Sequence, residues 1–300
     1  MIKELQMKKF VVITDTCSDL DASLREEYGV EYLPMGYSVD GVGFEADLDW
    51  KHRSFKDFYD AMRAGKRFIT AQVNTESFKN GFIKYIEEGY DVLYLSASSK
   101  LSSSIHASCV AREEVMKTHP SAKICCVDSL RSCHAEGLLA IRAAKMRDNG
   151  STLEETVAWL EENKLTAHTE ATVDKLTYLR QAGRVNAASA FFGGLLNIKP
   201  IIIGDAIGQN FAVEKVKTRK KSLLRLIERV EERYLENDYP VFVSHADSLE
   251  DAEYVRDILK EKLGADVRIG KVGPTIGATT GPGMIGVHFF GVKETCNAEK

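Results

Sequence analysis

Short apolar runs alternate with segments of helical periodicity between residues 10 and 165, and this alternation limits the possible folds most strongly. Strands are predicted at Lys9–Thr14, Asp91–Leu95 and Lys123–Ser129, and in the segments between them apolar residues recur every three or four positions. Strands that alternate with helices form parallel sheets with helices packed on both faces. The sequence therefore predicts an α/β fold with a doubly wound parallel sheet in its N-terminal part.

The pattern changes after Leu165, where strands follow one another with fewer helices between them. A loop at Gly204–Gln209 joins two of these strands as a hairpin, which indicates antiparallel pairing. We therefore expect an α+β domain with a mixed or antiparallel sheet, and we divide the chain into domains 1–165 and 166–300. The strands predicted in the second domain are Thr166–Val173, Lys199–Asp205, Asn210–Lys217, Pro240–Ser244, Asp266–Gly270 and Met284–Phe290.

Other elements are predicted from turn and capping residues. One extended segment is expected over Val30–Val39, turned back by Asp40-Gly41, and Thr70 and Gln72 are placed in a connection. Ser151-Thr-Leu-Glu154 is predicted as a capping box that opens a helix ending at Asn163. The further predicted helices are Leu20–Tyr28, Ser54–Ala64, Ser77–Glu88, Ser104–Val115, Cys133–Arg147, Ser189–Leu196, Ser222–Leu235 and Leu249–Leu263.

Composition narrows the class of protein. The 300 residues are 44% hydrophobic and 28% charged, with a net charge of −4. Neither the composition nor the net charge indicates a nucleic-acid-binding protein. No apolar run approaches the ~20 residues needed to span a membrane, and the start of the chain lacks the apolar core of a secretory signal. The six cysteines form no C-x-x-C pair, and we expect reduced core residues in a cytoplasmic protein.

The stretch Leu95–Ser104 is the first candidate binding site. It links a buried strand to a helix through small hydroxylated residues, and the free N–H groups and positive dipole of a helix start attract anions. A carboxylate or phosphate is the expected ligand. The alternative is that Ser102 or Ser103 only caps the helix. Asp15, Ser96 and Asp128 end predicted parallel strands, so they should gather along one edge of the sheet.

Three further motifs each allow a functional and a structural interpretation. Lys215–Lys221 is the main basic run, either a docking face for an acidic or phosphorylated partner or a solvated helix start. Arg184 follows a glycine and suits either an anion or a surface ion pair. The Gly- and Pro-rich segment Gly273–Gly286 is expected to lead directly into a strand, so we discount a phosphate-cradling loop there.

Residues that suggest catalysis are weaker candidates. His245-Ala-Asp247 could form an acid/base pair, or Asp247 could cap a helix while His245 packs inside. Cys17 is more simply a buried thiol than a nucleophile, and no cluster has the spacing of metal ligands along the sequence. The alternative function that follows is a small-molecule hydrolase or phosphotransferase that uses Asp15, Ser102 and His245.

Several stretches in this order together resemble the DegV family of bacterial fatty-acid-binding proteins, from about Phe10 to Gly291. The stretches that carry the resemblance are Ile13–Leu20, Thr70-Ala-Gln72, Ser98–Ser102, Val127-Asp-Ser129, Leu176–Val185, Leu195–Ile201, Glu214–Lys221 and Gly281–Gly286. The resemblance implies two α/β domains with a long-chain fatty acid bound between them and no catalytic residue, metal or cofactor. It further implies that some members carry the bound acid to a separate fatty-acid kinase.

The resemblance also assigns candidate residues. Thr70 and Ser102 would hold the carboxylate, with Ser98 and Ser99 as second candidates. Arg184 would lie in the kinase-docking region, and we add Arg219 and Lys220 of the basic run to that region. Two positions depart from the family pattern. Ser103-Ser-Ile replaces a glycine and an aromatic residue, and Thr279 stands where many kinase-linked members carry histidine. A threonine can hydrogen-bond a carboxylate but supplies no positive charge.

Overall fold

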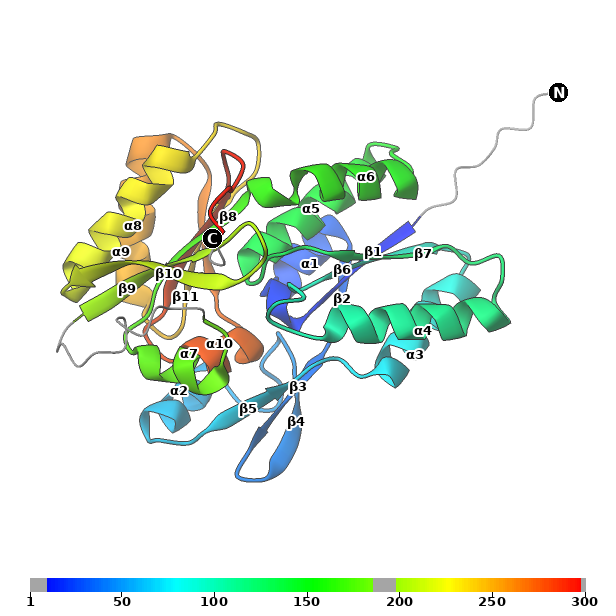
Figure 1. Cartoon of the computed structure of the whole chain (residues 1–300), viewed down its shortest axis with the longest axis horizontal. Coiled ribbons are helices and arrows are strands. Elements are labelled where there is room, and N and C mark those ends of the chain that lie inside the picture. The colour runs from blue at the N-terminus through cyan, green and yellow to red at the C-terminus, as the bar shows by residue number, and fades with distance from the viewer. Residues whose placement is uncertain (1–9, 186–197, 298–300) are drawn as a thin grey trace.

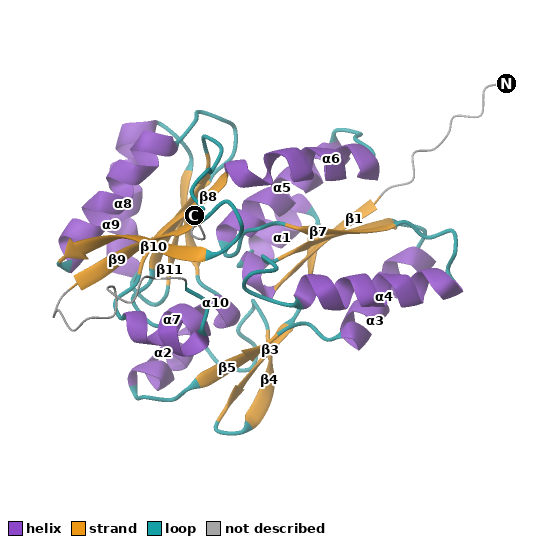
Figure 2. Cartoon of the chain, in the orientation of Figure 1, coloured by secondary structure: helices purple, strands orange, loops and turns teal. Residues whose placement is uncertain are grey.

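The computed structural model describes residues 10–185 and 198–297, and it contains three β-sheets surrounded by helices (Figure 1). The sheets have the strand orders β2-β1-β6-β7, β4-β3-β5 and β10-β9-β8-β13-β11-β12. The first sheet lies on the right of the view and the last on the left, with the small sheet below them (Figure 2). No helix of the described residues is long and apolar enough to cross a bilayer.

The N-terminal sheet is parallel throughout, as the alternating pattern predicts. Helices α3 and α4 pack on one face, while α5 and α6 pack on the other and α1 packs beside α5. The residues of β1 alternate between the two cores: Val11 and Ile13 join the α3–α4 side, while Phe10 and Val12 join the α5 side. The elements are β1 (Phe10–Asp15), β2 (Val30–Leu33), β6 (Asp91–Ser96), β7 (Ile124–Asp128), α1 (Ala22–Tyr28), α3 (Thr75–Glu87), α4 (Ser104–Thr118), α5 (His134–Asp148) and α6 (Leu153–Asn163).

The small antiparallel sheet corrects two expectations. The segment predicted as one extended element over Val30–Val39 is two strands in different sheets, β2 and β3 (Met35–Val39), separated by Pro34. Thr70 lies in a strand, β5 (Phe68–Ala71), rather than in a connection, because β5 pairs with β3. The third strand, β4 (Val42–Ala46), returns from β3 through Asp40 and Gly41, which both have positive φ as this tight turn requires.

The C-terminal sheet is mixed, as expected. Only β11 and β12 pair in parallel, and the hairpin between β9 and β10 is the predicted one. Helices α8 and α9 pack side by side against this sheet and bury a separate core. The described elements are β8 (Ala167–Thr172), α7 (Leu176–Ala182), β9 (Ile198–Gly204), β10 (Asn210–Lys217), α8 (Arg219–Arg233), β11 (Val241–His245), α9 (Leu249–Leu263), β12 (Val267–Lys271), α10 (Pro274–Thr280) and β13 (Ile285–Phe290).

Three local predictions need comment. The capping box is wrong by one residue, because Thr152 caps the helix and Glu155 returns the hydrogen bond. The Gly- and Pro-rich segment does not lead directly into a strand, since Pro274 at the first helical position opens the short helix α10. The helix predicted at Ser189–Leu196 lies outside the described residues.

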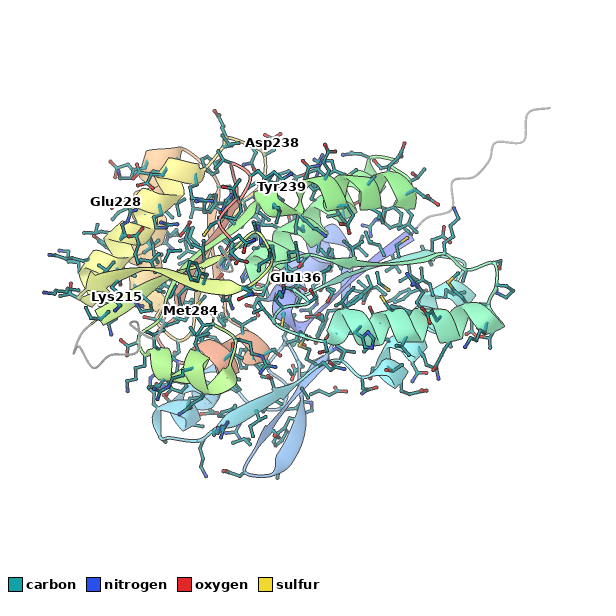
Figure 3. All side chains as sticks on the ribbon, in the orientation of Figure 1. Glu136, Lys215, Glu228, Asp238, Tyr239 and Met284 are labelled. Atoms are coloured by element: carbon teal, nitrogen blue, oxygen red, sulfur yellow. The ribbon has the colours of Figure 1, made fainter. Side chains whose placement is uncertain are left out.

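Helix α5 packs between the two large sheets, with contacts to β1 and β6 on one side and to β8 and β13 on the other. Glu136, in its first turn, lies near the centre of the molecule (Figure 3). That side chain is fully buried, and burial raises the pKa of Glu136 well above its ordinary value, so it is uncharged. One core cluster contains α5 together with Val12 of the first sheet and Phe242 and Phe290 of the last. The division of the chain into two domains near residue 165 therefore remains a proposal, because the two halves share this core cluster.

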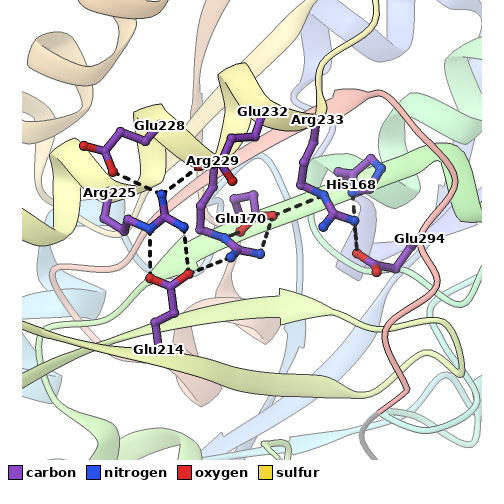
Figure 4. A network of polar contacts seen from close by, with 9 residues as sticks. All are labelled: His168, Glu170, Glu214, Arg225, Glu228, Arg229, Glu232, Arg233 and Glu294. Atoms are coloured by element: carbon purple, nitrogen blue, oxygen red, sulfur yellow. Dashed lines mark hydrogen bonds and ion pairs between the residues drawn. The ribbon is translucent and has the colours of Figure 1, made fainter.

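A network of ion pairs links α8 to the C-terminal sheet (Figure 4). Arg229 forms two hydrogen bonds to the fully buried Glu170 of β8, at 2.6 and 3.1 Å, and a third to Glu214 of β10 at 2.7 Å. Arg233 joins the buried Glu294 beside His168. Buried charges are tolerated when several hydrogen bonds satisfy them.

We predict that Glu170→Ala lowers the free energy of unfolding by about 3–5 kcal/mol, because it leaves Arg229 half-buried without its bidentate partner. Urea denaturation followed by circular dichroism measures this loss. The matched control is Glu228→Ala, which removes an exposed partner of Arg225 and should cost less than about 1 kcal/mol. Equal losses for the two variants would contradict the assignment.

Candidate functional site

A cavity with an empty volume of about 980 Å³, including its open part, lies between the first sheet, the small sheet and the C-terminal sheet. Cys17 follows β1, Ala97 follows β6 and Cys133 comes soon after β7, so the cavity lies at the carboxyl ends of these parallel strands. Ligand sites of open α/β sheets lie at this edge. Asp15, Ser96 and Asp128 end neighbouring strands, as expected, but none of the three lines the cavity.

Most of the cavity wall is apolar. Among the described residues that line it, none is Asp, Glu or Lys, and Arg184 is the one cation. The hydroxyl side chains among them come from separate elements and include Thr70 of β5, Ser102 of the loop before α4 and Thr279 of α10. The wall therefore combines apolar side chains with hydroxyl groups. Its larger apolar side chains are Met35, Leu101, Val173, Leu179, Ile202 and Met284.

The serine loop places Ser102 at the start of α4. The Ser102 N–H donates to the Ser98 carbonyl at 3.0 Å, and the Ser102 oxygen accepts from the Ser104 N–H at 3.2 Å. The Ser102 and Ser104 hydroxyls lie 3.1 Å apart, and a hydroxyl can donate or accept. Ser103, the residue before the helix, makes no side-chain capping bond. Ser102 therefore caps the helix start and also faces the cavity.

Thr70 and Thr279 differ in how free their hydroxyls are. Thr70 is half-buried in β5, opposite Tyr37 of β3. The Thr279 hydroxyl donates to the Ile276 carbonyl at 2.8 Å, so it must leave this bond before it can donate to a ligand. Thr70 and Ser102 are thus the stronger donors toward the cavity.

Ser98 and Ser99 do not line the cavity. The buried Ser98 hydroxyl donates to the Gly208 carbonyl at 2.7 Å and so joins the loop to the β9–β10 hairpin. Ser99 is exposed, and its N–H donates to Asp128. We therefore drop both as carboxylate ligands.

The three residues of the alternative enzyme do not share a site. Asp15 does not line the cavity, because its carboxylate accepts from the Cys17 N–H at 2.8 Å, the Tyr94 hydroxyl at 2.8 Å and the Ala97 N–H. Burial raises the pKa of Asp15. The His245 ring stacks edge-on against Phe55, and its Nδ1 accepts from the Ser248 N–H. His245 therefore has no geometry for activating Ser102, and the prediction of a packed histidine is the better one.

Asp247 was expected to cap the following helix. Instead it forms an ion pair with Arg63 of α2 (Phe55–Arg63). Nearby, the Tyr59 hydroxyl donates to the Val272 carbonyl at 2.9 Å, and the Gly273 N–H donates to Asp19 at 2.9 Å. These bonds hold the start of α10 against the N-terminal half and so close one wall of the cavity.

The three predicted docking residues differ in their surroundings. Arg184 is exposed at the cavity edge, where its Nε donates to the Leu101 carbonyl. Arg219 forms an ion pair with Asp251 and donates to the Gly283 carbonyl, so its charge is neutralised within the chain. Lys220 is exposed at the start of α8.

A second hollow adjoins the cavity and shares Thr70, Arg184 and Thr279 with it. Four further cationic side chains line this hollow: Arg63, Lys66, Arg67 and Lys175.

Comparison with known proteins identifies the family. The model of a family described as "Uncharacterised protein, DegV family" matches residues 9–291. The chain belongs to the DegV family. A DegV domain-containing protein of Clostridium perfringens is 36% identical over 287 residues, which make up 95% of this chain and 98% of the relative.

Solved DegV structures have the same fold. A DegV lipid-binding protein from Thermotoga maritima gives a TM-score of 0.83 at 28% identity, over 96% of this chain and 100% of that one. A second Thermotoga maritima protein, described as having a fatty acid binding function, gives a TM-score of 0.81 at 28% identity, over 95% and 100% of the two chains. The predicted α/β fold and the predicted resemblance are confirmed.

Several lining residues of this DegV protein were missed, although one pattern could have found them. Thr169, Ala171 and Val173 are every second residue along and just after β8, and all three line the cavity. One face of this strand therefore forms part of the cavity wall. Thr275 and Thr280 were missed because α10 was not predicted.

We predict that Gly277→Ala destabilises this DegV protein by about 1–3 kcal/mol, because the added Cβ would lie 2.3 Å from the Tyr59 hydroxyl and force α10 away from α2. Thermal unfolding measures the change. The matched control is Gly43→Ala, where the added Cβ meets nothing within 4 Å. A Gly277→Ala variant as stable as this control would show that α10 does not depend on the contact.

Proposed function

We propose that the chain binds a long-chain fatty acid in the cavity between its two halves and that Thr70 and Ser102 hold the carboxylate. One observation carries the proposal: hydroxyls from two separate elements line the same, mostly apolar cavity. The relatives described as lipid-binding and fatty-acid-binding proteins support it, because they share the fold over nearly the whole chain.

The acyl chain supplies most of the binding free energy. Burying one CH₂ group contributes about 0.8 kcal/mol before the costs of association. The apolar side chains that come from both halves would surround the chain along its length.

The head group needs no full counter-charge in this arrangement. Hydrogen bonds to a carboxylate favour its charged form, and the start of α4 adds the positive end of a helix dipole. Thr70 and Ser102 are the primary ligands in our proposal. Thr279 is a secondary contact, because its hydroxyl already donates to Ile276.

We further propose that the protein is a non-catalytic carrier that presents the bound acid to a partner kinase. The cavity meets the hollow beside Thr70 and Thr279, where Arg67 and Lys175 place positive charge next to the acid's head. Arg63 and Lys66, which also line the hollow, are paired with Asp247 and Asp40. A phosphoryl donor is strongly anionic and would be attracted there. Arg184 and Lys220 are the proposed docking residues, and Arg219 is dropped because Asp251 neutralises it.

We predict that the delipidated chain takes up one palmitate, detected by native mass spectrometry. Thr70→Val and Ser102→Ala should each weaken palmitate binding by about tenfold or more, since a hydrogen bond to a charged group contributes about 1.5–3 kcal/mol. Ser99→Ala is the matched control, because Ser99 lies outside the cavity, and its affinity should not change. A wild-type chain that takes up no palmitate would refute the proposal.

We predict that charge reversal at Arg184 together with Lys220 weakens binding of a bacterial fatty-acid kinase by about tenfold at low salt, with a smaller effect at high salt. Titration calorimetry with the purified kinase measures this. Lys123→Glu is a control for charge reversal elsewhere on the surface, because Lys123 directly precedes β7 and is paired with the exposed Glu154. Unchanged kinase affinity in the double variant would exclude these residues from the docking face.

A further inference from the structure

Three buried side chains meet behind the cavity wall at the start of α5. Cys133 immediately precedes the helix, His134 is its first residue, and His288 comes from β13 in the C-terminal sheet. One ligand atom from each lies within 4.8 Å of the other two. We propose that Cys133, His134 and His288 form a binding site for one Zn²⁺ ion. Sequence spacing gives no sign of it, because the third ligand comes from the last strand.

The distances suit a zinc ion after a small adjustment. The Cys133 sulfur lies 3.7 Å from Nδ1 of His134. Zn–S and Zn–N bonds of about 2.3 and 2.0 Å place tetrahedral ligand atoms about 3.3–3.8 Å apart. The two distances to the His288 nitrogen are at most 4.8 Å, so binding requires them to shorten by up to about 1–1.5 Å.

His288 provides an independent sign of a missing ligand. Its ring is fully buried, its Nδ1 lies 3.1 Å from the Thr169 hydroxyl, and its Nε2 has no hydrogen-bond partner. An unpaired buried polar atom is costly and calls for an explanation. The contact with Thr169 also fixes the orientation of the ring, as the outer partners of zinc-bound histidines commonly do.

Two polar side chains lie beside the three ligands. The Ser244 hydroxyl lies 2.8 Å from Nδ1 of His134, so an ion bound at that nitrogen replaces this hydrogen bond. Where a zinc ion has three protein ligands, water takes the fourth position. The Asp19 carboxyl interacts with the Cys133 thiol. Zinc binding replaces the thiol proton of Cys133 by a Zn–S bond, and the proton leaves to solvent through the cavity.

The ion has a path to the site. Cys133 and Thr169 both line the cavity, so a metal ion can reach the sulfur without unfolding the chain. Cys133 also has a φ of 56°, a conformation that is uncommon for a residue with a side chain. Strain of this kind persists where the surrounding structure enforces it, and it is concentrated at functional sites.

Cobalt spectroscopy tests the proposal on the full chain after removal of lipid and metal. We expect one equivalent of Co²⁺ to give a thiolate-to-Co²⁺ charge-transfer band and strong tetrahedral d–d bands, both removed by one equivalent of Zn²⁺. Cys133→Ser should abolish the charge-transfer band, and His288→Gln should weaken Co²⁺ binding at least tenfold. The control is Cys109→Ser, since Cys109 lies half-buried on α4, away from the site.

A second measurement needs no variant. Zn²⁺ should raise the unfolding temperature of the wild-type chain in a concentration-dependent way, because the assembled site binds it more tightly than the unfolded chain does. Absence of a charge-transfer band, a band that persists in Cys133→Ser, or an unfolding temperature insensitive to Zn²⁺ would each overturn the proposal. The site is separate from Thr70 and Ser102, so a failure here leaves the proposed fatty-acid binding untouched.

Discussion

The burial of helix α5 on both sides is the interaction on which the rest of the structure depends. Residues 134–141, which make just over two turns of the helix, are all buried, so this part of the helix is stable only inside a core. A Cβ at Gly137 would lie 2.8 Å from Leu20 and from the Ser18 carbonyl, so only glycine allows the helix this close to the end of β1. The two large sheets are fixed relative to one another because both pack on this helix.

That arrangement explains why the cavity has walls from both halves. The loops after β1, β6 and β7 reach toward β8, β9 and α10, and the bonds of Tyr59 to Val272 and Asp19 to Gly273 keep α10 in place. The polar groups of these loops are largely used within the protein, as Asp15 and Ser98 illustrate. Thr70 and Ser102 are among the hydroxyl residues that line the cavity, and they carry the proposed function.

Local sequence patterns were sufficient for the large sheets, and they failed where tertiary contacts decide the structure. The alternation of apolar strands with helices predicted the parallel sheet, and the hairpin at Gly204–Gln209 predicted the antiparallel pairing of the mixed sheet. Pairing of β5 with β3 could not be predicted, because Thr70 lies in a short polar segment whose partner is distant in the chain. Helix α10 was missed for a related reason, since its glycines pack against Tyr59 and Tyr178 instead of favouring a helix themselves.

The sequence predicted the kind of side chain that lines the proposed site, but it did not predict all of the residues correctly. The serine loop and the T-x-Q segment pointed to Ser102 and Thr70, whereas Ser98 looked equivalent until Gly208 was seen to bind its hydroxyl. Arg219 likewise looked free until Asp251 was found beside it. The Cys133–His134–His288 cluster combines adjacent residues with a distant strand, so no spacing rule could reveal it.

The most direct test of the account is a crystal structure of the chain with bound palmitate. We predict that the carboxylate lies within hydrogen-bond distance of both the Thr70 and Ser102 hydroxyls, with the acyl chain between Val173, Ile202 and Met284. A carboxylate bound elsewhere, or an acyl chain on the outer surface with the cavity empty, would contradict it.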